Sequence, residues 1–77
     1  MFKDSIEPDM PVICSEGDEF AEVDHMEGDD MIKLKRDDDG VHHYIPLDWV
    51  STVADGKVQV DRSGSDVKAQ WSEIPSF

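Results

Sequence analysis

The fold class is decided by residues 50–60, which read VSTVADGKVQV. Two short strand-like runs, 50–53 and 57–60, flank the pair Asp55-Gly56. A type I′ turn needs a positive φ at both central positions, which Asp and Gly tolerate. The stretch therefore predicts a β-hairpin centred on Asp55-Gly56.

Turn signals recur along the rest of the chain, with glycines at positions 17, 28, 40 and 56, which are 11, 12 and 16 residues apart. Asp39-Gly40 is predicted to form the same turn type as Asp55-Gly56. Pro46 lacks a ladder donor, so a strand ends there and a tight corner, Pro46-Leu47-Asp48-Trp49, follows. The predicted strands are Met10–Cys14, Glu19–Met26, Met31–Lys35, Val41–Ile45, 50–53 and 57–60. Short strands at this spacing indicate a mainly β fold, a small antiparallel β-barrel of about six strands.

The alternation within the third run sets which side chains face the core. Ile32 and Leu34 point inward, while Lys33 and Lys35 point to water. Lys33, Lys35 and Arg36 form the densest basic cluster, and cross-strand pairing with the acidic second strand accounts for it.

The segment after the last strand changes character and predicts a short C-terminal helix. Ser63-Gly64-Ser65-Asp66 fits a helix-capping pattern, and Val67 and Trp71 then share one helical face. We expect that face to pack on the barrel. The predicted organisation is a flexible N-terminus at 1–9, a barrel at 10–62, the packed helix at 63–71 and a flexible tail at 72–77.

Length, charge and cysteine count exclude several classes of function. The 77 residues suit one domain with little room for an internal substrate cavity. A net charge of −12 argues against nucleic acid and anionic membrane surfaces. No apolar window is long enough to cross a membrane, and the N-terminus is not a signal peptide. The single cysteine, Cys14, is expected to be buried. Because one cysteine cannot form an intramolecular disulfide, the fold suits a reducing compartment such as the cytoplasm.

The negative charge is concentrated in the first part of the chain. Residues 1–32 hold eleven acidic side chains and one basic one, whereas residues 33–77 hold eight acidic and six basic side chains. Such asymmetry ordinarily favours solubility. The alternative interpretation is that the acidic first part of the chain forms a docking face for a basic partner.

The three histidines, His25, His42 and His43, are the candidate metal ligands. His42 and His43 are adjacent on a predicted strand, so their side chains point to opposite faces and do not chelate one ion easily. We expect a partly buried, hydrogen-bonded His43 and two surface histidines, His25 and His42. The pattern lacks the spacing of a zinc site.

The acidic turns do not form an EF-hand, because aligning Gly40 with the loop glycine places Lys35 and Pro46 at ligand positions. In an up-and-down meander, alternate turns lie at the same end of the molecule. The loops at 15–19 and 37–40 would then form an acidic pole that holds Ca²⁺ or Mg²⁺ weakly. Its carboxylates are those of Glu16, Asp18, Glu19, Asp37, Asp38 and Asp39.

No nucleophile triad, phosphate-binding loop or dinucleotide-binding motif occurs, so no catalytic, cofactor-binding or metal residue is assigned. Trp49 is expected to close the base of the barrel. Tyr44 and His42, with Lys33 and Lys35 of the neighbouring strand, are candidates for an exposed polar-aromatic patch suited to a protein interface, and ordinary surface is the alternative interpretation.

Three segments carry a resemblance to a known family: Val23-Asp24-His25-Met26-Glu27-Gly28, Ile32-Lys33-Leu34 and His42-His43-Tyr44-Ile45-Pro46-Leu47-Asp48-Trp49-Val50. They resemble small bacterial domains of unknown function whose pattern is similar to the PRC-barrel. A strand with a Val-x-Asp-like step and a later Ile-Pro-Leu corner are both present, and the resemblance spans residues 10–71. The sequence departs from the pattern at Phe20-Ala21-Glu22, where PRC-barrel families commonly have Gly.

The resemblance implies a binding or assembly module, because PRC-barrel domains serve that role in the photosynthetic reaction-centre H subunit and in ribosome maturation factors. We therefore expect a non-catalytic module with a protein partner, no nucleic acid, no membrane insertion and no cofactor. The chain is expected to be a monomer, with weak self-association through an edge strand left open. The alternative function is a small cation-binding or sensing domain that uses His25 and His43 or the acidic pole.

Overall fold

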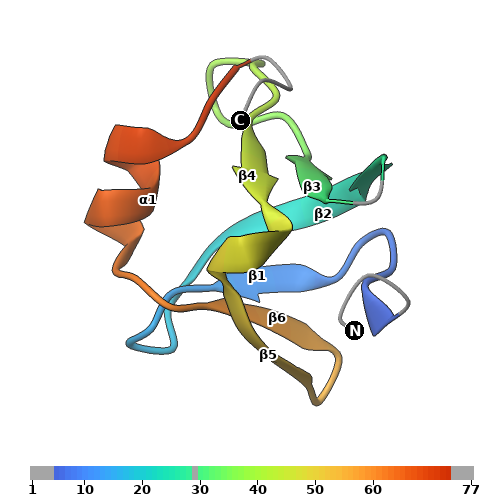
Figure 1. The fold of residues 1–77 in the computed structure, drawn as a ribbon. Helices are drawn as coiled ribbons and strands as arrows, with labels where there is room; N and C mark the ends of the chain where they lie inside the picture. Colours follow the sequence, from blue (N-terminus) through green and yellow to red (C-terminus); the bar gives the residue numbers. More distant parts are fainter. Residues whose placement is uncertain (1–4, 29, 74–77) are drawn as a thin grey trace.

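A computed structural model describes residues 5–28 and 30–73, and Figure 1 shows how the strands and the helix are arranged. The strands are β1 (Pro11–Ile13), β2 (Glu19–Glu27), β3 (Met31–Leu34), β4 (Tyr44–Pro46), β5 (Val50–Ala54) and β6 (Lys57–Val60). The 3₁₀ turn η2 (Leu47–Trp49) joins β4 to β5, and helix α1 (Gly64–Gln70) follows β6. The described strands form a six-stranded sheet in the order β4-β3-β2-β1-β6-β5. The predicted mainly β class with a short C-terminal helix is therefore confirmed.

The hairpin of β5 and β6 forms as predicted. Val53 pairs with Val58, and Ala54 pairs with Lys57. Asp55 and Gly56 have φ values of 56° and 75°, which are the two positive φ angles of a type I′ turn. The local twist of this turn matches the twist of the strands that it joins, so the sequence signal and the geometry agree.

The long strand β2 takes part in two ladders. Near its start Ala21 pairs with Val12 of β1, and near its end Met26 pairs with Ile32 of β3. Within the β2–β3 ladder the register shifts between Val23 and His25, at Asp24. A bulge bends a strand and increases its twist. In Figure 1 β2 accordingly curves from β1 to β3, and it carries the sheet from one half of the molecule to the other.

The strand pairing corrects the prediction of an antiparallel barrel. β1 and β6 run parallel, with Val12 opposite Val58 and Ile13 opposite Gln59, so the sheet is mixed. Side chains alternate with the same period in parallel and antiparallel strands, so the sequence pattern did not distinguish them. Among the described residues no ladder joins β4 to β5, the two edges of the sheet. The closed barrel is therefore not confirmed.

The fourth strand is shorter than predicted. It begins at Tyr44 rather than Val41, and it ends at Pro46 as the missing N–H requires. Tyr44 is buried, at 9% exposed, and its N–H donates to the carbonyl of Ser72 at 2.7 Å. The segment that follows α1 thus lies along β4. The predicted exposed patch around Tyr44 does not form.

The turn at residues 37–41 also differs from its prediction. Of the pair Asp39-Gly40, only Gly40 has a positive φ, at 79°, so the turn is not type I′. The side chain of Asp37 organises it instead, because its Oδ1 accepts from the N–H groups of Asp39 at 2.9 Å and Val41 at 3.0 Å. This is Asx-type chemistry, in which a side chain replaces a backbone acceptor.

The core is built mainly by side chains of the strands, and α1 adds one fully buried side chain to it. Its fully buried side chains come from the strands and from Val67 of the helix: Ile32, Leu34, Ile45, Val12, Val23, Val58, Val60 and Val67. Ile6 is buried as well, so the core reaches into the segment expected to be flexible, 1–9. Of the predicted flexible ends, residues 1–4 and 74–77 lie outside the described residues.

Helix α1 begins as its sequence predicts. The Oγ of Ser63 accepts from the N–H of Asp66 at 3.2 Å and caps the first turn. Val67 is fully buried and Trp71, at the end of the helix, packs against the core. The predicted common face of Val67 and Trp71 is thus confirmed. Neither this helix nor any other helical turn within 5–28 and 30–73 is long and apolar enough to cross a membrane.

Candidate functional site

An open groove of about 730 Å³ lies between the start of β2, the loop after β3 and the end of α1. Its apolar lining comes from Phe20, Ala21, Leu34 and Trp71. Its other lining residues are polar or charged: Glu19, Glu22, Lys35, Arg36, Asp37, Asp38, Asp39, His43 and Lys68. We refer to it below as the β2–α1 groove.

The aromatic side of the groove is built on a stack between His43 and Trp71. Their ring centroids are 3.9 Å apart and the planes differ by 11°. His43 is buried, at 8% exposed, and thus more deeply than the partly buried position predicted, whereas Trp71 is half-buried and lines the groove. Phe20 of β2 lies beside Trp71, with 6.3 Å between the centroids and a 50° tilt. Three segments distant in sequence thus place their rings together.

Asp37 connects the loop to the stacked histidine. Its Oδ2 lies 3.4 Å from the Nδ1 of His43, while its Oδ1 accepts the two loop N–H groups described above. The hydrogen bond from Val41 lowers the pKa of the Asp37 carboxyl, and the bond from Asp39 and the nearby His43 lower it further. The carboxylate is therefore held ionised, and it fixes one wall of the groove.

The basic residues of the groove are not all available to a ligand. The ammonium of Lys35 hydrogen-bonds Asp9, and that contact is the main reason why the pKa of Lys35 is raised. The N–H of Lys35 also donates to the Glu22 carbonyl at 2.8 Å. Lys33 stands opposite His25 in the β2–β3 ladder. The cross-strand ion pairs predicted between these lysines and the acidic second strand are not found among the described residues. Lys35 pairs instead with Asp9, which lies before β1, although nearby Glu22 and Asp24 also raise its pKa.

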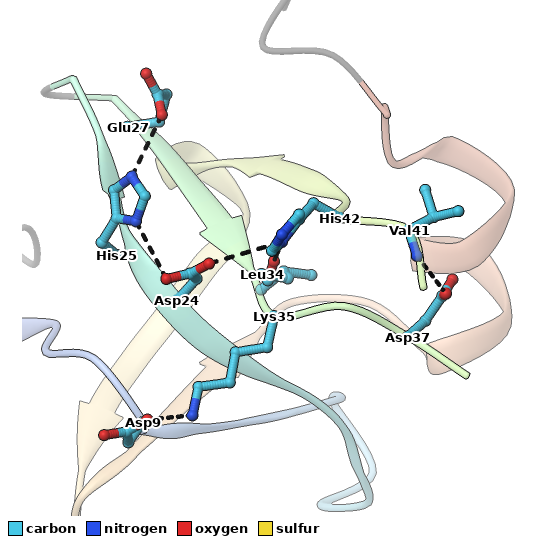
Figure 2. Close-up of polar contacts among 9 residues, drawn as sticks. All are labelled: Asp9, Asp24, His25, Glu27, Leu34, Lys35, Asp37, Val41 and His42. Atoms are coloured by element: carbon cyan, nitrogen blue, oxygen red, sulfur yellow. Dashed lines mark hydrogen bonds and ion pairs between the residues drawn. The ribbon is translucent and has the colours of Figure 1, made fainter. Parts of the chain in front are cut away.

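A second polar cluster gathers around Asp24, the residue at the bulge of β2 (Figure 2). Its two carboxylate oxygens lie 3.3 Å from His25 Nδ1 and 3.6 Å from His42 Nδ1. The hydrogen bond from His25 lowers the pKa of Asp24. His25 Nε2 lies 3.4 Å from Glu27. The sequence did not predict this link between His25 and His42. The link depends on Asp24, which lies at a bulge, and the alternation of apolar and polar residues does not predict a bulge.

The histidines are therefore placed in two separate environments. His25 and His42 share Asp24, whereas His43 contacts Asp37 and Trp71. His42 Nδ1 must carry a proton, because it donates to the Leu34 carbonyl at 2.8 Å. The proposed pairing of His25 with His43 does not occur. Within residues 5–28 and 30–73, no three His, Cys, Asp or Glu side chains are grouped closely enough to hold a metal ion.

The predicted acidic pole is brought together only in part. Glu19 and Asp37, Asp38 and Asp39 line the β2–α1 groove, while Glu16 and Asp18 line a neighbouring depression of about 320 Å³. The depression shares Glu19, Phe20 and Lys68 with the groove, so the two lie side by side. Cys14 is buried, as expected, at 3% exposed.

Trp49, predicted to close the base of the fold, is buried at 9% exposed. The guanidinium of Arg62 lies over its ring, 4.2 Å from the centroid. The N–H of Asp61 donates to the Trp49 carbonyl at 2.9 Å. Trp49 thus belongs to the core, whereas Trp71 lines the β2–α1 groove.

Residues 6–68 match the model of a family described as "Uncharacterized protein conserved in bacteria (DUF2171)". A search of curated proteins and a search of solved structures found no match.

Proposed function

Starting from the fact that the chain belongs to the bacterial family DUF2171, whose description names no activity, we propose that it is a non-catalytic protein-interaction module. Its docking site is the β2–α1 groove. The observation that carries the proposal is that Phe20 and Trp71, both half-buried, line an open groove with a charged rim. Aromatic anchors surrounded by polar residues are typical of protein interfaces.

The groove is pre-formed, which favours docking over chemistry. Trp71 is held by its stack with His43, and the loop wall is held by Asp37. A surface that is already ordered loses little conformational entropy on binding. His43 is the one imidazole in the groove lining, and it is 8% exposed and stacked, so it is badly placed to exchange protons with a substrate.

The PRC-barrel-like arrangement is part of the same proposal. The Ile45-Pro46-Leu47 corner that carries the resemblance forms the junction of β4 and η2. The bulged β2 carries its ladder from β1 to β3, a bend that a small barrel needs. We place the module in the cytoplasm, which the single buried Cys14 supports.

Site-specific photo-crosslinking in the bacterial host tests the proposal. A photoreactive phenylalanine analogue replaces Phe20 in the groove, and in a matched control it replaces Thr52, which is exposed on edge strand β5. We expect one abundant adduct with a single protein from position 20, and we expect Trp71→Ala to abolish it. Equal adducts from both positions, no adduct from position 20, or an adduct only from position 52 would overturn the proposal.

A further inference from the structure

We propose that the β2–α1 groove binds a basic linear segment of its partner and seats an Arg or Lys side chain beside Trp71 and Phe20. This inference rests on the proposed function, and it specifies the chemistry of the partner. It is carried by two observations at the same place, the charge of the rim and the aromatic lining.

The charge of the rim favours a cationic ligand. The lining holds five carboxylates against three cationic side chains, and one of the cations, Lys35, is bound to Asp9 outside the lining. Glu19, Asp38 and Asp39 are exposed, and their carboxylates have no ion-pair partner within the described residues. Because the whole chain carries a net charge of −12, an acidic segment would be repelled on approach.

The aromatic lining supplies the second part of the recognition. A guanidinium or ammonium placed over an indole face is attracted by its quadrupole. The protein already uses this contact once, where Arg62 lies 4.2 Å from the centroid of Trp49. His43 covers one face of Trp71 and fixes the indole plane. A partner side chain therefore meets an aromatic ring that is held in place next to unpaired carboxylates.

Two basic residues of the groove would repel a basic ligand, and they limit where it can lie. Arg36 and Lys68 also line the groove and are exposed. The basic side chain is therefore expected near Glu19, Asp38 and Asp39 rather than across the whole opening. A backbone carbonyl of the same segment is the natural acceptor for Arg36 or Lys68.

The test is an amide-resolved NMR titration of the full chain with capped hexapeptides. The probe alternates Arg and Ala; matched peptides replace Arg with citrulline, which is uncharged, or with Glu. We expect saturable shifts at Phe20, at Asp38 and at the Trp71 indole with the Arg peptide, and none at Thr52. Asp38→Asn with Asp39→Asn should weaken binding by about threefold to tenfold. The control, Asp48→Asn with Asp55→Asn, removes the same charge elsewhere on the exposed surface and should leave binding unchanged.

Each other outcome has a definite meaning. Equal binding of the citrulline peptide at the groove would overturn the cationic specificity while leaving the groove as a docking site. Shifts spread over all acidic surfaces, equally weakened by both double variants and lost at physiological salt, would show a polyelectrolyte response and overturn the inference. An absence of shifts with the Arg peptide would do the same, and the photo-crosslinking result would still decide the proposed function.

Discussion

His43 lies face to face with Trp71, with ring centroids 3.9 Å apart, although 27 residues separate the two along the chain. The stack joins the loop before β4 to the end of α1. It therefore does two things, because it fastens the helix to the sheet and it orients the indole that lines the β2–α1 groove.

A double-mutant cycle measures the energy of this stack. His43→Ala and Trp71→Ala should each destabilise the fold, and the two losses should be coupled by about 1 kcal/mol. Urea unfolding of the wild type, both single variants and the double variant gives the coupling. The control cycle combines His25→Ala with Trp71→Ala and should show none, since His25 contacts Asp24 and Glu27 instead. Additive losses in the first cycle would mean that the stack contributes nothing.

The Asp37 carboxylate predicts a pH-dependent contribution to stability. Its pKa is lowered in the folded state, chiefly by the hydrogen bond from Val41, so the folded chain prefers the ionised form. That contribution is complete above the unfolded pKa of about 3.9 and is lost as the pH falls through the lower folded pKa. Asp37→Asn should therefore be less stable than the wild type at pH 7, and the difference should shrink below about pH 4.

Thermal unfolding at a series of pH values checks this behaviour. The matched control is Asp38→Asn, in the same loop, whose side chain accepts no hydrogen bond within the described residues. A constant difference between Asp37→Asn and the wild type from pH 7 to pH 2 would contradict the assigned role of the carboxylate.

Two glycines separate backbone strain from steric space. A Cβ added at Gly56 or at Gly64 meets nothing within 4 Å, but Gly56 has a φ of 75° while Gly64 starts α1 with ordinary helical geometry. Gly56→Ala should therefore lower the free energy of unfolding by about 1 kcal/mol, because an L-residue is strained in the left-handed region. Gly64→Ala should stabilise by about 0.5 kcal/mol through a less flexible unfolded chain. Equilibrium unfolding measures both, and equal effects would refute the type I′ assignment.

A metal titration distinguishes the proposed interaction module from the alternative, a cation-binding domain. Asp24 contacts both His25 and His42 (Figure 2), but within residues 5–28 and 30–73 no three His, Cys, Asp or Glu side chains are grouped closely enough to hold a metal ion. Titration with Zn²⁺ and then Ca²⁺, followed by NMR, should give weak shifts spread over the acidic residues. Saturation at micromolar metal, lost in a His25→Ala and His42→Ala double variant, would favour the cation-binding function.

The parts of the fold that were predictable depend on local chemistry. The turn at Asp55-Gly56, the Ser63 cap, the inward Ile32 and the end of a strand at Pro46 each follow from residues a few positions apart. Such signals report backbone preferences and side-chain period, which act over short distances.

The parts that were missed depend on contacts distant in sequence. The alternation of apolar and polar residues does not indicate that β1 pairs in parallel with β6. Nor does it indicate that the chain near Ser72 covers Tyr44. The groove is of the same kind, because Phe20, His43 and Trp71 come from three separate segments. The helical spacing of Trp71 predicts that it packs on the core, and it does so while also lining the groove.

The most direct test of the central claim is a chemical-shift map of the chain bound to the protein captured through position 20. We expect the largest changes on residues 19–22, on residues 35–39 and on the Trp71 indole, with β5 unchanged. Changes confined to β5 and η2, with the Trp71 indole unmoved, would contradict it.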